Sequence, residues 1–250
     1  MTRKPVMAGN WKMYKTPAET KAFFEKFLPL VSGATHCEIV INPPFVNIAA
    51  AVEATKGSRV EVGGQNLYWA KEGAFTGEIS GPMLKASGAE WVIIGHSERR
   101  QYFGETDETV LKRTVAALEA GLKPIVCVGE MLAEREAGET EAVLRTQFDG
   151  GIAGLTAEQF AKIVIAYEPV WAIGTGKTAT PEMAADAHRV LRGLVSAKFG
   201  ADAGAAIRIL YGGSVKPDNV KGLMAQPEID GALVGGASLE AGSFASIVNF

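Results

Sequence analysis

Short apolar segments that alternate with amphipathic helical segments along the whole sequence limit the folds that this chain can adopt. Eight of the short segments are rich in β-branched residues, as buried strands are, and helically spaced apolar residues lie between them. Eight units in 250 residues average about 31 residues, the length of one strand–helix repeat. The predicted strands cover residues 6–11, 38–42, 59–63, 91–95, 123–128, 163–167, 207–211 and 231–234.

Eight such repeats favour a closed parallel barrel over an open doubly wound sheet. An open sheet of that kind usually has a GxGxxG turn after its first strand, whereas this first strand ends in Gly9-Asn10-Trp11-Lys12. The sequence has no linker, low-complexity tract or shift in composition. We therefore predict an α/β protein with a single domain, a closed (β/α)8 barrel over residues 1–250.

Two of the predicted helices begin with clear capping signals. Thr16 precedes Pro17, and Glu19 stands three residues after the threonine, which is the pattern of a capping box. Thr180 precedes Pro181 in the same way, and the apolar residues that follow have helical spacing. Both threonines are therefore predicted to cap helices.

The composition argues against several classes of protein. A net charge of −3, a pI near 5.8 and scattered Lys and Arg argue against a nucleic-acid partner. No apolar run approaches the roughly 20 residues that cross a bilayer, and the basic start lacks the apolar stretch of a signal peptide. Cys37 and Cys127 fall in separate segments, which disfavours a disulfide. We expect a cytoplasmic protein without a membrane partner.

The sixth predicted strand ends in a carboxylate, and an unusual loop follows it. Glu168 stands at the end of that strand, directly after Tyr167, and Pro169 prevents the strand from continuing because it has no N–H to donate. The next four residues are strongly apolar for a loop, and Gly174 and Gly176 allow the backbone to approach a ligand closely. This pattern indicates a flap. Its closure would remove water from Glu168 and make that carboxylate a stronger base.

Other polar residues stand where predicted strands end, and in a barrel these ends meet on one rim. Asn10 and Lys12 follow the first strand, and His96 follows the fourth. Gly213-Ser214 and Gly235-Gly236 follow the seventh and eighth strands, where backbone N–H groups can hold an anion. A base, a cation, an imidazole and two glycine turns together indicate a small anionic substrate with an acidic C–H.

The residues after His96 predict a helix that begins at Ser97. Backbone N–H groups at a helix start favour a neutral imidazole, which can donate one N–H to an oxyanion. The charge of Glu98 acts in the opposite direction, so both protonation states stay open. Glu98 is also a partner that would hold Lys12 in position. Three histidines without paired spacing, and no cysteine cluster, predict that the chain has no metal site.

A long loop at residues 65–79 is too apolar for a segment in contact with water. It contains Leu67, Tyr68, Trp69 and Phe75, and exposed apolar patches of this kind usually mark interfaces. The loop supports a homodimer. The alternative is a loop that folds onto its own barrel.

Seven motifs, in order and over essentially the whole chain, resemble the triosephosphate isomerase family. One glycine turn is a weak signal, but seven motifs with family-like spacing are specific together. The resemblance implies a homodimeric TIM barrel that interconverts dihydroxyacetone phosphate and D-glyceraldehyde 3-phosphate in glycolysis, without cofactor or metal. The motifs are GNWKM (9–13), GAFTGEIS (73–80), IGHSERR (94–100), PIVCVGE (124–130), YEPVWAIGTGKTATP (167–181), YGGSV (211–215) and VGGASL (234–239).

The resemblance also implies a role for each matching residue. Glu168 matches the general base, His96 the group that polarises the carbonyl, and Asn10 and Lys12 the pair that contacts substrate. The phosphate-binding positions are Gly174, Ser214, Gly235 and Gly236, besides Asn10 and Lys12. The supporting and lid positions are Ser97, Glu98, Glu130, Pro169, Val170, Trp171, Ala172, Ile173, Thr175, Gly176, Lys177 and Tyr211. The dimer interface positions are Gln65, Phe75 and Thr76, of which Thr76 is expected to reach the partner's active-site region.

Two stretches depart from the family pattern. Tyr14-Lys15 follow Met13 where a smaller polar residue such as Asn is expected beside the interface pocket, and residues 240–250 are unlike the usual ending. The packing of the dimer therefore stays open.

Two other functions remain as alternatives. A phosphate-binding barrel aldolase or lyase needs a desolvated Schiff-base lysine at the barrel mouth, where strand six has Glu168, while Lys162 stands at the other end. A catalytically inactive phosphate-binding scaffold would have no need for Asn10, Lys12, His96 and Glu168 together.

Overall fold

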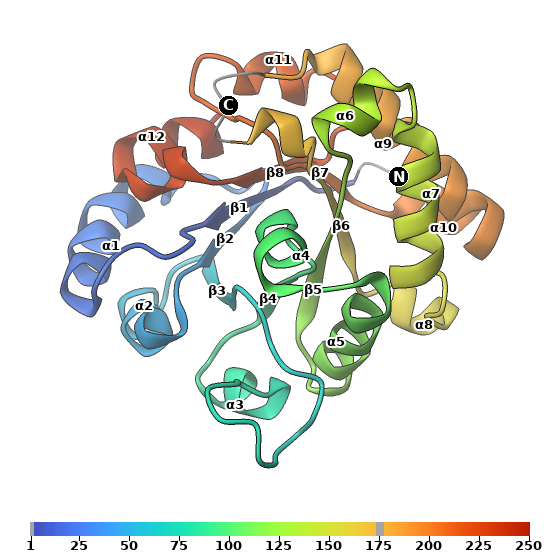
Figure 1. Ribbon diagram of the computed structural model, residues 1–250. Coiled ribbons are helices and arrows are strands. Elements are labelled where there is room, and N and C mark those ends of the chain that lie inside the picture. The colour runs from blue at the N-terminus through green and yellow to red at the C-terminus, as the bar shows by residue number, and fades with distance from the viewer. Residues whose placement is uncertain (1–2, 174–177) are drawn as a thin grey trace.

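Eight parallel strands close into a barrel in the computed structural model, which describes residues 3–173 and 178–250. The strands pair in chain order, and β8 pairs with β1 to complete the ring (Figure 1). Val6 stands opposite Glu38 on one side and Gly231 on the other. The predicted closed barrel is confirmed. The strands are β1 Val6–Asn10, β2 Glu38–Asn42, β3 Val60–Gly64, β4 Trp91–Ile94, β5 Lys123–Val128, β6 Val164–Tyr167, β7 Ile209–Tyr211 and β8 Gly231–Val234.

Helices surround the outside of these strands (Figure 1). They outnumber the strands because some connections hold more than one helix. The α-helices are α1 Pro17–Val31, α2 Ile48–Ala54, α3 Gly81–Ala86, α4 Ser97–Phe103, α5 Asp107–Glu119, α6 Leu132–Glu136, α7 Thr140–Gly151, α8 Ala157–Phe160, α9 Pro181–Phe199, α10 Ala201–Ala206, α11 Val220–Met224 and α12 Ala241–Val248. The 3₁₀ turns in the described part of the chain are η1 Phe45–Asn47, η2 Val170–Ala172 and η3 Gly236–Leu239. No helix in residues 3–173 and 178–250 is long and apolar enough to span a membrane.

The predicted capping residues begin the helices expected of them. The Thr16 side chain accepts the backbone N–H of Glu19, whose carboxylate accepts the N–H of Thr16 in return. Thr180 accepts the N–H of Met183 at the start of α9. These side chains satisfy N–H groups that have no partner within the helix.

The ends of the strands differ from the sequence prediction by no more than two residues. β1 ends at Asn10 because Trp11 turns out of the barrel, and its ring packs edge-on against Phe23 of α1 with 4.8 Å between ring centroids. β7 begins at Ile209, two residues later than predicted. The sequence pattern gives no signal for either shift, because the end residues Trp11 and Ile207 are as apolar as the strand residues near them.

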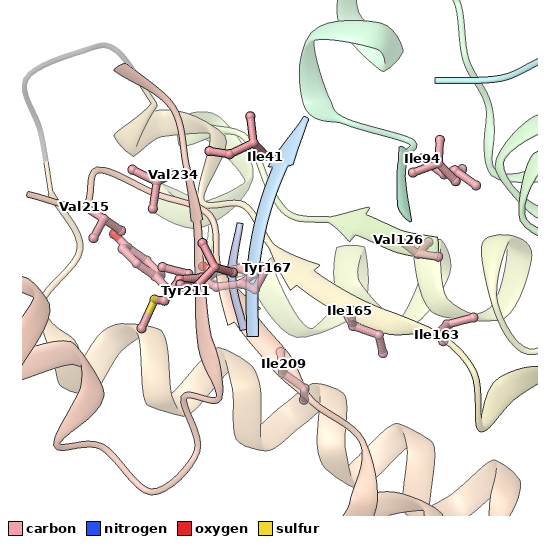
Figure 2. Packing of buried hydrophobic residues seen from close by; sticks show 14 of the residues in the cluster. Ile41, Ile94, Val126, Ile163, Ile165, Tyr167, Ile209, Tyr211, Val215 and Val234 are labelled. Carbon is pink, nitrogen blue, oxygen red and sulfur yellow. The ribbon is translucent and has the colours of Figure 1, made fainter. Parts of the chain in front are cut away.

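Two apolar layers result from the alternation of side chains along each strand. Outward-facing residues pack against the helices, and Figure 2 shows two of them, Tyr167 and Tyr211, which are neighbours on β6 and β7. Inward-facing residues fill the barrel interior, where Trp91 is fully buried. The inner layer consists of Val6, Ala8, Val40, Trp91, Ile93, Ile125, Cys127, Val164, Ala166, Leu210 and Leu233.

The next inward positions, one step closer to the strand ends, are polar or have no side chain. Two residues beyond Ala8 and Ala166 come Asn10 and Glu168, and two residues beyond Cys127, Leu210 and Leu233 come Gly129, Gly212 and Gly235. Large side chains therefore fill the middle of the barrel. At its mouth, glycines leave space around the amide of Asn10 and the carboxylate of Glu168.

His188 of α9 is a buried base on the outside of the barrel. Its ring meets the Tyr167 ring edge-on at 5.7 Å, and its Nδ1 lies 3.0 Å from the carbonyl oxygen of Glu228. Burial lowers the pKa of His188 to about 4. The folded protein therefore holds this imidazole neutral where the unfolded chain would take up a proton.

We predict that His188 makes stability depend on pH. Between about pH 6.5 and pH 4 the unfolded state binds more protons than the folded state. The free energy of unfolding is therefore highest above pH 6.5 and decreases as the pH falls below that value. A pKa difference of this size corresponds to about 3 kcal/mol by pH 4. Urea unfolding at pH 7.5 and pH 4.5 should show a smaller loss of unfolding free energy in His188→Asn than in the wild type. Equal losses would contradict the prediction.

Candidate active site

A cavity of about 530 Å³ opens at the ends of the strands, above the inner layer. Its walls contain residues that follow β1, β4, β6, β7 and β8, as a barrel mouth requires. Seven of the predicted catalytic and phosphate-binding residues line it, and so does Ile173 of the predicted lid: the seven are Asn10, Lys12, His96, Glu168, Ser214, Gly235 and Gly236. Its other lining residues are Tyr14, Ile173, Gly212, Gly213, Val215, Lys216, Leu233, Ala237 and Leu239.

Glu168 is held by two hydrogen-bond donors from the same segment. Its Oε1 lies 2.8 Å from Nε2 of His96, and its Oε2 accepts the backbone N–H of Ser97 at 2.9 Å. The residue is only 2% exposed. A carboxylate removed from water in this way needs such donors to remain charged.

His96 is the capping residue of α4. Gly95 before it has a positive φ of 69°, which turns the chain from β4 into the helix and brings the imidazole to the rim. Nδ1 of His96 accepts the backbone N–H of Glu98 at 3.2 Å. These contacts assign the ring proton to Nε2, which faces Glu168.

The pKa values of His96 and Glu168 are coupled. Burial lowers the pKa of His96, but the carboxylates of Glu168 and, to a smaller extent, Glu98 together raise it above its usual value. Burial raises the pKa of Glu168, but His96 and the N–H of Ser97 lower it more, so that it lies below its usual value. Glu168 is therefore ionised. The raised pKa of His96 depends on that carboxylate remaining beside the ring.

Lys12 is fixed in a strained conformation. Its φ of 50° is rare for a residue with a side chain and costs on the order of 1 kcal/mol. Its backbone N–H donates to Oδ1 of Asn10 at 3.0 Å, and its carbonyl accepts Nε2 of Gln65 at 2.8 Å. Its ammonium lies 2.5 Å from Oε1 of Glu98, the partner that the sequence indicated. Backbone and side chain are thus both held in place.

Two glycines that sequence reasoning did not single out make room for Glu168. A Cβ on Gly129 would lie 1.8 Å from the backbone oxygen of Glu168, and a Cβ on Gly212 would lie 2.8 Å from its Cγ. Both glycines stand at inward positions, and this spacing is the feature of the sequence from which their role could have been predicted. Cys127 lies below the carboxylate, and burial together with Glu168 keeps its pKa well above the usual value, so the thiol stays protonated.

Glu130 joins the start of the flap segment to the barrel. It is fully buried, and its Oε1 accepts the Tyr167 hydroxyl and the Trp171 indole N–H, each at 3.0 Å. Arg135 lies 3.3 Å from the same oxygen and stacks on the Trp171 ring at 5.1 Å. The described part of the flap, including the turn η2, is therefore anchored by a charged and aromatic cluster.

Comparison with known proteins agrees with this geometry. The family model for triosephosphate isomerase matches residues 5–250. The chain belongs to the triosephosphate isomerase family. The triosephosphate isomerase of Solibacter usitatus is 76% identical over 248 residues, 99% of this chain and all of that protein. That of Citrifermentans bemidjiense is 57% identical over 99% of both chains. The crystal structure of triosephosphate isomerase from Bartonella henselae matches with a TM-score of 0.89 and 40% identity over 98% of both chains.

The remaining residues singled out by family resemblance fall into three groups. Ser97 supports Glu168 from below the cavity, and Glu98 lines a neighbouring opening with Lys12. Tyr211 is buried away from the cavity; burial raises its pKa to about 12, and the backbone N–H of Ala179 acts in the opposite direction. Pro169, Val170, Trp171, Ala172 and Ile173 form the described flap segment, while Gly174, Thr175, Gly176 and Lys177 lie outside the described residues.

The predicted interface residues of the family lie near that opening or on the surface. Gln65 lines the opening and also braces Lys12 and the carbonyl of Asn42 within the same chain. Phe75 is 43% exposed although its ring packs on Tyr68 at 4.6 Å. Thr76 is exposed. Residues 3–173 and 178–250 contain no group of three or more His, Cys, Asp or Glu that could hold a metal ion.

We predict that Glu168→Gln lowers the pKa of His96. The substitution removes the negative charge that raises this pKa and leaves burial, which lowers it. An NMR titration of the histidine ring protons can follow His96, because the chain has only three histidines. Glu61→Gln, near the opposite end of the barrel, is the control. An unchanged His96 pKa in Glu168→Gln would show that the carboxylate is not the cause.

Proposed function

We propose that Glu168 transfers the proton in the interconversion of dihydroxyacetone phosphate and D-glyceraldehyde 3-phosphate. The activity itself follows from family membership, which makes this chain an isomerase of triose phosphates. The assignment to particular residues rests on one observation. A buried carboxylate with a lowered pKa faces a strand-end cavity that also holds an imidazole N–H and an ammonium.

The phosphate of the substrate binds at the loops after β7 and β8. Ser214, Gly235 and Gly236 line the cavity there, and the turn η3 begins at Gly236. Backbone N–H groups at such loops can point at an anion, and glycine lets the anion approach closely. Gly174 of the flap is proposed to add a further N–H. Lys12 and Asn10 contact the substrate from the opposite wall.

The proton moves between two neighbouring carbons of the triose. Glu168 leaves Nε2 of His96 and the N–H of Ser97, takes a proton from one carbon and returns it to the next. Losing these two donors removes the larger causes of the lowered pKa of Glu168, so the carboxylate becomes a stronger base when it reaches the substrate. The contacts with His96 and Ser97 thus hold Glu168 as a weak base, and its basicity increases when the side chain moves to the substrate.

The same movement frees the imidazole. Nε2–H of His96, which now donates to Glu168, becomes available to the carbonyl oxygen of the substrate, where negative charge develops. Without the Glu168 carboxylate beside it, the main cause of the raised His96 pKa disappears. The neutral ring then acts as a donor, held in that tautomer by the N–H of Glu98 at Nδ1.

Residues 169–179 serve as a lid in this proposal. Ile173 already lines the cavity, and Trp171 is anchored to Glu130 at the base of the segment. An enediolate beside a phosphate group readily expels phosphate, so the intermediate has to be covered and kept dry. Tyr211 and Ser214 are proposed to hold the closed lid, consistent with the position of the Tyr211 hydroxyl near Ala179.

The alternative functions have little support. The Lys12 ammonium lies 2.5 Å from Glu98, whereas a Schiff-base lysine has to be free of such a partner to attack a carbonyl. The comparisons place the chain among isomerases rather than aldolases, lyases or inactive scaffolds. We further propose that residues 1–250 are one catalytic domain that works in cytoplasmic glycolysis without metal, cofactor, membrane or nucleic-acid partner. Two buried free cysteines support a reducing compartment.

We also propose that the protein is a homodimer formed through the loop at residues 65–79. Exposed apolar side chains stand in and beside this loop, because Phe75 belongs to it and Met13, Tyr14 and Phe103 line one opening with Gln65. Apolar patches of that kind mark interfaces. An opening of about 480 Å³ beside Lys12 could receive the partner's loop. Tyr14 and Phe103 form part of its wall, so Tyr14 would pack at the interface.

Glu168→Gln should lower turnover of D-glyceraldehyde 3-phosphate by at least about 10²-fold, the smaller end of what general-base catalysis contributes. Binding of a non-reacting triose phosphate analogue should stay nearly intact, because the amide keeps the shape of the side chain. A coupled assay and calorimetry measure the two effects, with Glu158→Gln on the surface as a control. Turnover within a few-fold of the wild type would remove Glu168 from the mechanism.

Thr76→Arg should convert the dimer into a monomer, because a long charged side chain at the proposed contact cannot be buried without a partner. Thr76 is exposed, so the fold of one chain should tolerate the change. Light scattering should report twice the chain mass of 26.4 kDa for the wild type and the single mass for the variant. Thr146→Arg, exposed on α7, is the matched control. A wild type of single-chain mass would refute the interface.

A further inference from the structure

Lys216 is a cation of the cavity that neither the motifs nor the family resemblance singled out. It follows Ser214 and Val215 in the loop after β7 and lines the cavity on the side where the phosphate is proposed to bind. Its side chain is exposed, and it forms no ion pair with any described residue. Lys12, by contrast, is already paired with Glu98.

The backbone around Lys216 is held rigidly. The N–H of Lys216 donates to Oδ1 of Asn219 at 2.8 Å, and Nδ2 of Asn219 donates to the carbonyl of Ser214 at 3.0 Å. Val215 between them is buried. One asparagine side chain therefore spans the segment from Ser214 to Lys216 and fixes the base of the Lys216 side chain at the cavity wall.

The charges around the cavity show what Lys216 contributes to the net charge near the site. Lys12 and Glu98 neutralise each other at 2.5 Å, which leaves the ionised Glu168 as an uncompensated negative charge. The whole chain carries a net charge of −3. A phosphorylated substrate is a dianion and would be repelled by this arrangement. Lys216 is the remaining cation among the described residues that line the cavity, and it brings the local balance to zero.

We propose that Lys216 attracts the phosphate of the substrate into the cavity and adds to its binding, so that it sets the preference for phosphorylated over neutral substrates. This inference rests on the proposed function of the site. An exposed cation at the mouth acts on approach and binding, which are shared by ground state and transition state. Lys216 therefore affects kcat/KM through KM and leaves kcat nearly constant.

The test compares Lys216→Gln with the wild type in the isomerisation of D-glyceraldehyde 3-phosphate. At low ionic strength we expect kcat/KM to fall roughly three- to tenfold, with kcat within about twofold. The difference should shrink as sodium chloride rises to about 0.5 M, because salt screens exposed charges. The inhibition constant of inorganic phosphate should rise by a similar factor, and the loss should be much smaller with neutral D-glyceraldehyde.

Two matched variants separate charge from other effects. Lys216→Arg keeps the charge and should retain most of the wild-type kcat/KM. Lys221→Gln removes an exposed lysine of α11 that does not line the cavity, and should match the wild type at every salt concentration. Equal loss with charged and neutral substrates, or a fall in kcat alone, would overturn the proposal.

The outcomes for this inference and for the proposed function are distinguishable. A wild type that does not isomerise D-glyceraldehyde 3-phosphate refutes the proposed function. An active wild type together with an unaffected Lys216→Gln refutes only the role of Lys216.

Discussion

The contact between the Glu168 carboxylate, the His96 imidazole and the N–H of Ser97 is the interaction on which the rest of the site depends. A carboxylate that is 2% exposed has lost almost all its water, and this would raise its pKa if no donors replaced the water. His96 and Ser97 stand side by side because Gly95 turns the chain directly after β4 and α4 begins at Ser97. A single strand-to-helix turn thus holds both the base and the proposed electrophile.

The barrel makes this contact possible through its inner layers. Residues such as Trp91 and Leu210 fill the interior and exclude water from below, whereas Gly129, Gly212 and Gly235 leave space at the next level. A side chain on Gly129 or Gly212 would collide with Glu168. The strained backbone of Lys12 is likewise maintained by its surroundings. A positive φ there is maintained because Asn10 and Gln65 hold the backbone on both sides.

Much of this arrangement could be predicted from local patterns. The predicted strand ends lie within two residues of the observed ones, and the predicted threonine caps begin their helices. The residues that follow the strand ends meet in one cavity, because the parallel strands of a barrel share one rim. The pairing of Lys12 with Glu98 was also indicated, since both flank strand ends. The bracing of Lys12 by Gln65 was not. Gln65 was predicted only as an interface residue, and the residue spacing does not specify which side chains turn toward the same loop.

The sequence by itself determined the alternation of eight strands and helices, the side of each strand that faces inward, and the residues at the strand ends, because these follow from side-chain periodicity and short-range hydrogen bonding. Only the tertiary structure decided which charges neutralise each other. Lys12 is paired with Glu98, whereas Lys216 has no ion-pair partner among residues 3–173 and 178–250, although both lysines follow the ends of strands. Electrostatic attraction depends on the distance between groups that are far apart in the chain, and that distance is fixed only when the barrel closes.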